Sequence, residues 1–293
     1  MAQNSLTEGN SRTATLLLTL PGMVWLTALL ILPCGLILAY SFLERGTYGG
    51  IVYNLNFSNF IRSFESIYVS IFLTSLRIAS LATLFALIIA YPAAYAISRL
   101  PARQQLIVLF LVILPFWSNY LIRSYAWMVI LNNQGVLNQA LLSSGLASQP
   151  IKFLYNEFAV VLGLVYSYLP FVILSIFASI QRLNPELIEA SADLGAPGWR
   201  TFLRVMLPMT SSGIVAGAIF VFVLSMGNFV TPDLLGGGQV TMVGNVIFGQ
   251  FMSARDWPFG AALSLFLLTI MFGLLSAQAY FARNANVQAE LAT

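Results

Sequence analysis

Six long apolar segments constrain this chain more than any other feature of its sequence. A helix that crosses the hydrocarbon core of a membrane needs about 20 consecutive, mostly apolar residues. Segments of that length lie near residues 15–42, 67–97, 105–130, 157–180, 209–230 and 259–282. Because a backbone in lipid must satisfy its own hydrogen bonds, this pattern predicts an all-α integral membrane protein with about six transmembrane helices.

The composition agrees with a surface that faces lipid. Only 8% of the 293 residues are charged, whereas soluble domains carry about 25%. The net charge of +3 is too small to indicate nucleic-acid binding. The chain has no histidine and a single cysteine, Cys34, and it lacks the sequence pattern of a phosphate-binding loop. We therefore expect no catalysis, no metal and no cofactor in this chain.

The distribution of Lys and Arg among the loops predicts the orientation. With the N-terminus in the cytoplasm, the inner segments hold seven basic residues and the outer segments hold four. We expect a disordered cytoplasmic N-terminal tail over residues 1–13, a transmembrane domain over residues 14–282 and a cytoplasmic C-terminal tail over residues 283–293. The longest polar passage between two apolar segments, residues 181–208, then lies in the cytoplasm.

Residues 181–208, which we call the polar loop, contain the start and stop signals of two short helices. The side chain of Asn184 can accept a free backbone N–H, and Pro185 fits the first helical position. Gly195 can adopt the left-handed conformation that ends a helix. Pro208 is expected to close the second helix, because proline lacks an N–H and clashes with the preceding turn. Such a helix pair is suited to docking onto a partner.

The polar loop resembles the EAA loop of type I ABC importer permeases, which has the form EAA-x3-G-x9-I-x-LP. The chain matches this spacing, with Ser191 in place of Ala and Val205 in place of Ile. The resemblance implies that the loop inserts into a cleft of a separate ATPase. The residues expected to act in this coupling are Glu189, Ala190, Asp193, Leu194, Gly195, Leu207 and Pro208. The alternative is an ordinary loop that joins two spans.

Three further stretches resemble the first permease subunit of spermidine/putrescine ABC importers. They are LPFWSNYLIRSYAW (114–127), GNFVTPDLLGG (227–237) and ARDWPFGAALS (254–264). The resemblance implies a bacterial inner-membrane complex with a second permease subunit, an ATPase dimer that holds ATP and Mg, and an extracytoplasmic substrate-binding protein. It also implies alternating access, in which closure of the ATPase dimer draws the coupling loops together. The implied solute is a polyamine, and related permeases carry opines and other small organic solutes.

Aromatic and polar residues at membrane depth are candidates for the solute pathway. Aromatic ring faces attract cations, and carbonyl oxygens accept hydrogen bonds from ammonium groups. The candidates are Trp117, Asn119, Tyr120, Tyr125, Trp127, Tyr166, Tyr168, Asn228 and Asp233. The alternative is that Trp and Tyr mark the membrane interfaces. Arg77 and Arg123 also lie at membrane depth, and we expect a structural role for Arg123, since it would repel a cationic solute.

Two further patterns concern packing and the outer segments. Gly213 and Gly217 have the GxxxG spacing that lets two membrane helices approach closely. The outer segments are residues 46–66, 132–156 and 231–258, and the last two contain candidate short helices. These segments are either ordered loops or a landing surface for a substrate-binding protein.

Other classes of function stay open on the residues alone. A self-contained secondary carrier or channel for a small organic cation usually has acidic or histidine residues in its spans, and we place none there. An intramembrane enzyme would need histidine or paired carboxylates within the spans. A scaffold that binds partners without transport is the third alternative.

Overall fold

The computed structural model describes the backbone of residues 4–47 and 49–291 and the side chains of residues 18–47 and 49–277. The chain divides into two compact units, and each is described by itself. The first contains the residues up to Phe64 together with Gly249–Phe266, and the second contains Glu65–Phe248 together with the residues from Leu267 onward.

Both ends of the described chain are helical. Helix α1 (Asn4–Ser41) begins inside the expected N-terminal tail, and α14 (Trp257–Leu291) continues into the expected C-terminal tail. The expectation of disorder is therefore wrong for residues 4–13. The remaining tail residues, 1–3 and 292–293, lie outside the described residues. The cytoplasmic location of both ends stays a prediction.

In the first unit, α1 is followed by a short hairpin and a short helix. Strand β1 (Glu44–Arg45) pairs with the antiparallel strand β2 (Ile51–Val52). Helix α2 (Ser58–Ser63) comes next. These two-residue strands are the only β-structure in the part of the chain that the structure describes, so the predicted all-α class is confirmed.

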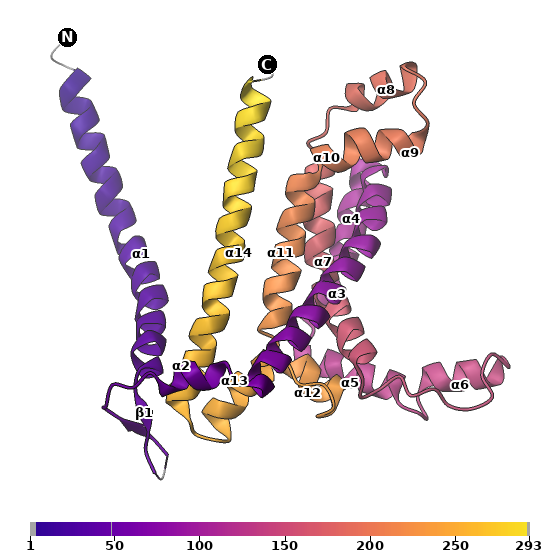
Figure 1. The fold of residues 1–293 in the computed structure, drawn as a ribbon. Coiled ribbons are helices and arrows are strands. Elements are labelled where there is room, and N and C mark those ends of the chain that lie inside the picture. The colour runs from indigo at the N-terminus through magenta and orange to yellow at the C-terminus, as the bar shows by residue number, and fades with distance from the viewer. Residues whose placement is uncertain (1–3, 48, 292–293) are drawn as a thin grey trace. The chain divides into compact units, whose positions relative to one another are not determined.

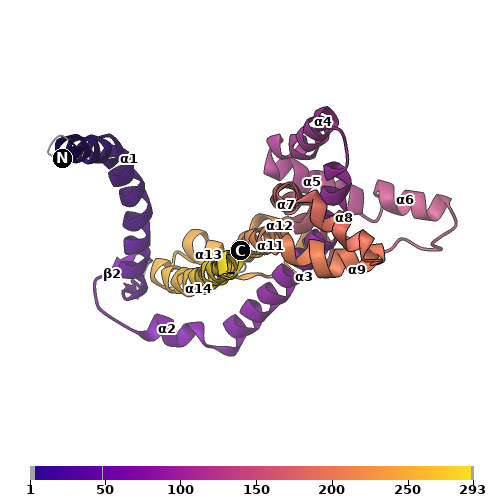
Figure 2. The same ribbon diagram turned by 90° about the horizontal axis from the view of Figure 1, so that it is seen from above.

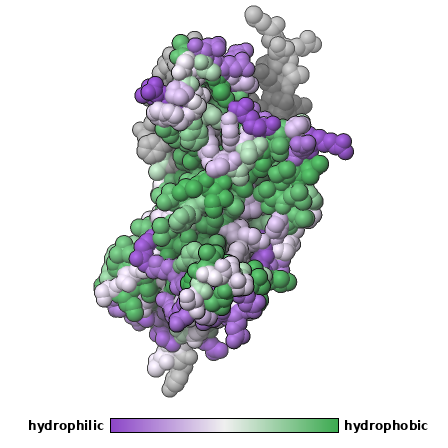
Figure 3. Space-filling view, turned by 90° about the vertical axis from the view of Figure 1, so that its right-hand side faces the viewer, coloured by the Kyte–Doolittle hydropathy of each residue, from purple (hydrophilic) through white to green (hydrophobic). Residues whose placement is uncertain are grey.

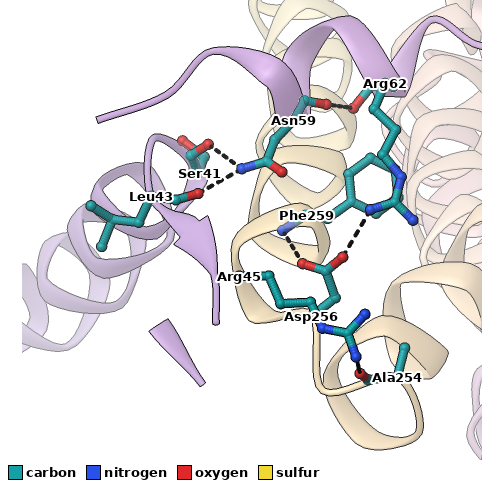
Figure 4. A network of polar contacts seen from close by, with 9 residues as sticks. Ser41, Leu43, Arg45, Asn59, Arg62, Ala254, Asp256 and Phe259 are labelled. Carbon is teal, nitrogen blue, oxygen red and sulfur yellow. Dashed lines mark hydrogen bonds and ion pairs between the residues drawn. The ribbon is translucent and has the colours of Figure 1, made fainter. Parts of the chain in front are cut away.

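A polar network orders the first unit around a buried carboxylate (Figure 4). Asp256 is 2% exposed, and it accepts the Phe259 N–H at 3.2 Å in the first turn of α14. It also accepts a hydrogen bond from Nη1 of Arg62 at 2.8 Å, while the Arg62 guanidinium lies 3.9 Å from the centre of the Phe259 ring. Asn59 donates to the carbonyl oxygen of Ser41 at 3.2 Å. The segment around α2 is therefore ordered, and its role as a landing surface stays a prediction.

Three helices form the core of the second unit. They are α3 (Ser66–Ser98), α7 (Glu157–Ile180) and α11 (Ser211–Met226). Each packs against the other two, and they lie side by side in both ribbon views (Figure 1, Figure 2). Helix α3 buries an alanine at every fourth position, and these small side chains allow close packing: Ala82, Ala86, Ala90 and Ala94.

The GxxxG pair lies where α11 crosses α7. A Cβ atom added to Gly213 would lie 2.3 Å from the Ser179 Oγ, and one added to Gly217 would lie 3.1 Å from a methyl carbon of Val172. Only hydrogen fits at the first position without movement of α7. The predicted close approach of two helices is confirmed.

The third apolar segment is a broken helix rather than the single span expected over residues 105–130. Helix α4 (Ala102–Ile113) passes into the 3-10 helix η1 (Leu114–Trp117), and α5 (Tyr120–Leu131) follows. The direction changes by 90° at this break. Asn119 starts the new helix, because its side chain accepts the Leu121 N–H at 2.8 Å.

The fifth apolar segment is also shorter than expected. Helix α11 ends at Met226 rather than near residue 230, and the chain bends by 68° where the preceding helical turns meet it. Helix α12 (Val230–Gly236) follows and ends at Gly237, whose φ of +55° lies in the left-handed region that glycine adopts without strain. Helices α6 (Val136–Ser143) and α13 (Val243–Met252) confirm the short helices predicted in the outer segments.

By length and composition, four of the described helices can cross a membrane, or six if each bent pair counts as one span. In the space-filling view, hydrophobic side chains gather across the middle of the visible face, and hydrophilic side chains gather above and below (Figure 3). This distribution fits a surface that meets lipid at its middle and water at its ends.

Candidate functional site

The first half of the polar loop folds as its sequence predicts. Helix α8 (Pro185–Asp193) starts after Asn184, whose side chain accepts the Glu186 N–H at 3.1 Å. Gly195 has φ +73° and ends the helix in the left-handed conformation. The predicted start and end of this helix are confirmed.

The second half of the loop contains a π-helical turn that the sequence did not predict. Helix α9 (Gly198–Thr201) passes through the π-helical turn η2 (Phe202–Met206) into α10 (Leu207–Met209). Pro208 lies in the last turn of this helical run, which ends at Met209, and α11 starts at Ser211 after a 68° bend. The predicted end of the second helix is therefore confirmed to within one residue. Since Pro208 has no N–H to donate to the Arg204 carbonyl, the preceding turn widens to the π geometry.

Side-chain contacts join the two helices of the polar loop to each other and join the loop exit to helix α3. The Ser191 and Thr201 hydroxyl oxygens lie 2.9 Å apart and join α8 to α9, so the serine that departs from the EAA pattern has a structural partner. The buried hydroxyls of Tyr91 in α3 and Thr210 lie 3.0 Å apart, and the Tyr91 ring meets the Phe202 ring edge-on at 5.2 Å. These contacts make the loop exit part of the packed core.

The outer surface of the polar loop carries exposed apolar side chains. Leu194 is 88% exposed and Trp199 is 62% exposed. The other predicted coupling residues are also exposed except for the half-buried Leu207: Glu189, Ala190, Asp193, Gly195 and Pro208. The Leu194 and Trp199 side chains are therefore both accessible to another protein. Trp199 was not among the coupling residues predicted from the sequence, although a tryptophan in a polar loop could have marked it as a candidate.

Three of the predicted pathway residues meet in one hydrogen-bonded group with Thr231, which we call the tyrosine–asparagine cluster. The amide nitrogen of Asn228 donates to the hydroxyl oxygens of Tyr120, at 2.6 Å, and Tyr168, at 2.8 Å. Its oxygen accepts the Thr231 N–H at 2.9 Å, and the Thr231 hydroxyl bonds to that of Tyr120. Thr231 was not among the residues predicted for the pathway. A capping pattern could have revealed it, because an asparagine three residues earlier can accept a backbone N–H at the start of a helix.

A pocket of about 300 Å³ lies beside this cluster. It is lined by Tyr168, Val223, Leu224, Gly227, Asn228, Phe229 and Val230. The break between α11 and α12 creates this space, because the chain leaves helical geometry at Gly227. The Asn228 oxygen accepts the Thr231 N–H, and the Tyr168 hydroxyl accepts from Asn228 and donates to the Leu224 carbonyl at 3.3 Å. The groups left for a solute are therefore the second lone pair of that hydroxyl and the aromatic ring faces. These groups suit an ammonium or another small organic cation.

The other predicted pathway residues lie outside the cluster. Trp127 and Tyr166 form an edge-on pair with ring centres 5.4 Å apart. Asn119 is used as the cap of α5. Three are largely exposed: Trp117, Tyr125 and Asp233.

The two arginines at membrane depth have partners within the second unit. Nη1 of Arg123 donates to the Pro115 carbonyl at 3.2 Å, and the guanidinium lies 5.2 Å from the Phe116 ring centre. It thus binds a carbonyl oxygen at the break in the third span, in agreement with the expected structural role. Arg77 forms an ion pair with Glu157 at the start of α7.

Broken membrane helices beside a small pocket, together with an anchored helical loop, are typical of the membrane subunit of a transporter. The chain belongs to the family of binding-protein-dependent transport system inner membrane components, which matches residues 5–287. It is therefore the multi-pass inner-membrane permease of an ABC importer, which works with an ATPase and a binding protein. This assignment replaces the alternatives of a self-contained carrier, an intramembrane enzyme and a scaffold.

Similar proteins have been named in several bacteria. The chain is 42% identical over 247 residues to the spermidine/putrescine transport system permease protein PotB of Haemophilus influenzae, covering 84% of this chain and 86% of that protein. It is 41% identical over 251 residues to PotB of Escherichia coli K12, covering 86% and 91%.

The fold also resembles a solved structure. A bacterial alginate ABC transporter in complex with an alginate pentasaccharide-bound periplasmic protein contains a chain that superposes with a TM-score of 0.74. The match covers 97% of this chain and 98% of that one at 19% identity, so the likeness concerns the fold.

Proposed function

We propose that this permease carries a polyamine of the spermidine or putrescine type. The observation that carries the proposal is the 42% identity to a permease whose name specifies spermidine and putrescine, over most of both chains. The pocket beside the tyrosine–asparagine cluster supports it, because hydroxyl oxygens and aromatic rings suit ammonium groups.

We also propose that the polar loop couples transport to ATP hydrolysis in the partner ATPase. In this proposal Leu194 and Ala190 fill a cleft on the ATPase, Glu189 makes a polar contact, and Leu207 and Pro208 set the angle of the loop against α11. The anchoring of Thr210 to Tyr91 supports this role, since a coupling element must move as a rigid body.

The complete complex in this proposal has a second permease subunit, two ATPase subunits and the extracytoplasmic binding protein. Both chain ends and the polar loop face the cytoplasm, where ATP is available. ATP closes the ATPase dimer, the two coupling loops approach each other, and the permease pair turns outward to accept the solute.

The proposed solute is tested by the ATPase activity of the reconstituted complex with its binding protein. Spermidine, putrescine and an opine form the opening panel. Stimulation by the binding protein loaded with spermidine or putrescine is expected. If only the opine-loaded protein stimulates turnover, the polyamine assignment is wrong while the importer class stands.

The coupling role predicts that Gly195→Asp abolishes transport and lowers co-purification of the ATPase, while the protein stays in the membrane. Gly195 has φ +73°, a conformation that costs a residue with a side chain about 1–2 kcal/mol, and the new carboxylate would lie at the docking surface. Gly145 is a matched control, because its φ is +72° and its surroundings are equally open. Gly145→Asp should leave ATPase binding intact. Normal uptake by Gly195→Asp would contradict the docking role.

A further inference from the structure

An apolar groove of about 480 Å³ lies between α3 and the exit of the polar loop, apart from the tyrosine–asparagine cluster. It is lined by Leu87, Ile88, Tyr91, Pro92, Tyr95, Phe202, Leu207 and Ile214. Two of its side chains carry a hydroxyl group, and that of Tyr91 is paired with Thr210. The groove therefore favours a hydrocarbon ligand over a polar solute.

The apolar lining fits within one membrane leaflet. On α3 it runs from Leu87 to Tyr95, and eight residues of helix rise correspond to about 12 Å. Half of the hydrocarbon core is about 15 Å thick. Arg99 follows Tyr95 by four residues, about one helical turn beyond the end of the lining.

The guanidinium group of Arg99 lies near the end of the groove, where α3 ends. Nη2 of Arg99 donates to the hydroxyl oxygen of Tyr95 at 2.7 Å, and the guanidinium lies 5.0 Å from the centre of that ring. Tyr95 is part of the groove wall, so it holds the cation at the groove mouth. Among the described side chains, carboxylates pair only with Arg62 and Arg77, which leaves Arg99 without an anionic partner there.

We propose that this groove binds an anionic phospholipid, with an acyl chain along α3 and the phosphate at Arg99. The apolar wall, which fits within one leaflet, and the Arg99 guanidinium held on Tyr95 match the two parts of such a lipid. A transmembrane helix of another subunit fits less well, because it would need a groove through both leaflets.

Lipid in the groove would contact the residues that anchor the polar loop. Tyr91, Phe202 and Leu207 line the groove, and the first two also join the loop exit to α3. Bound lipid would therefore stabilise the packed position of the loop exit.

The test uses the complete transporter complex in nanodiscs that contain phosphatidylglycerol or phosphatidylcholine with a photoreactive group at the middle of an acyl chain. Crosslinked peptides are mapped by mass spectrometry. Crosslinks are expected in residues 87–95 and 202–214, with phosphatidylglycerol favoured about five-fold, which corresponds to one interfacial cation. Arg99→Gln should remove this preference, and Ile88→Trp should reduce crosslinking of both lipids by filling the groove.

Arg103→Gln is the matched control, because Arg103 is an exposed arginine near the same end of α3 and does not line the groove. The proposal is wrong if both lipids crosslink equally, if Arg103→Gln acts like Arg99→Gln, or if the groove peptides carry no lipid. Crosslinks from the groove to the second permease subunit instead of lipid would also overturn it.

Discussion

The three side-chain hydrogen bonds of Asn228 lead to a quantitative prediction for Asn228→Ala. Asn228 is 9% exposed and donates to Tyr120 and Tyr168. Side-chain hydrogen bonds between membrane helices contribute about 0.6 kcal/mol on average and up to about 1.7 kcal/mol. The two bonds to the tyrosines are therefore expected to contribute about 1–3 kcal/mol together.

The third bond of Asn228 adds a separate cost. Its oxygen accepts the N–H of Thr231, a residue that is 1% exposed. A buried donor that loses its partner costs about 1–3 kcal/mol. We therefore expect Asn228→Ala to lower the free energy of unfolding by about 2–6 kcal/mol.

The assay is unfolding of the purified chain in mixed micelles, followed by circular dichroism as the fraction of denaturing detergent rises. Asn133→Ala is the control, because Asn133 is an exposed asparagine outside the cluster. Tyr168→Phe combined with Asn228→Ala should cost less than the sum of the single changes, by about 0.6–1.7 kcal/mol. A loss below about 0.5 kcal/mol for Asn228→Ala, or strict additivity of the pair, would refute the reasoning.

Two further predictions concern packing and charge. Gly213→Val should lower the free energy of unfolding by about 1–3 kcal/mol, because the new side chain clashes with Ser179. Gly35→Val is the control, since Gly35 has open space around it and should show no such clash penalty. Equal losses in the two variants would count against the close approach of α11 and α7. Arg62→Ala should cost about 2 kcal/mol, since it leaves Asp256 buried without its cation. That cost is below the roughly 3–5 kcal/mol of a fully buried pair because the Arg62 side chain is 41% exposed, and an unchanged unfolding curve would contradict it.

The polar loop was predictable wherever a local rule decided its conformation. Asn184 and Gly195 start and end α8 as expected, because a cap and a left-handed glycine act on neighbouring backbone groups. Pro208 lies one residue before the end of the second helix, again as expected, but the π-helical turn before it was not predicted. The loop exit is also held to α3 through Tyr91 and Thr210, a contact between residues far apart in the sequence.

The candidate site was predictable only as a set of residue types. Tyr120, Tyr168 and Asn228 were candidates among nine residues, and nothing in the sequence separated them from Trp117 or Tyr125. The structure selects these three because the breaks before α5 and after α11 direct them toward one point. Asn228 meets partners 108 and 60 residues away.

The sequence by itself determined the membrane class, the helices of the polar loop and the close approach at Gly213, because apolar length, capping and the absence of a side chain are properties of short segments. Only the tertiary structure decided which spans break, which aromatic residues share a pocket and which exposed residues surround the loop. Those features depend on helices that meet far apart along the chain, where the packing of one helix determines the hydrogen-bond partners available to another.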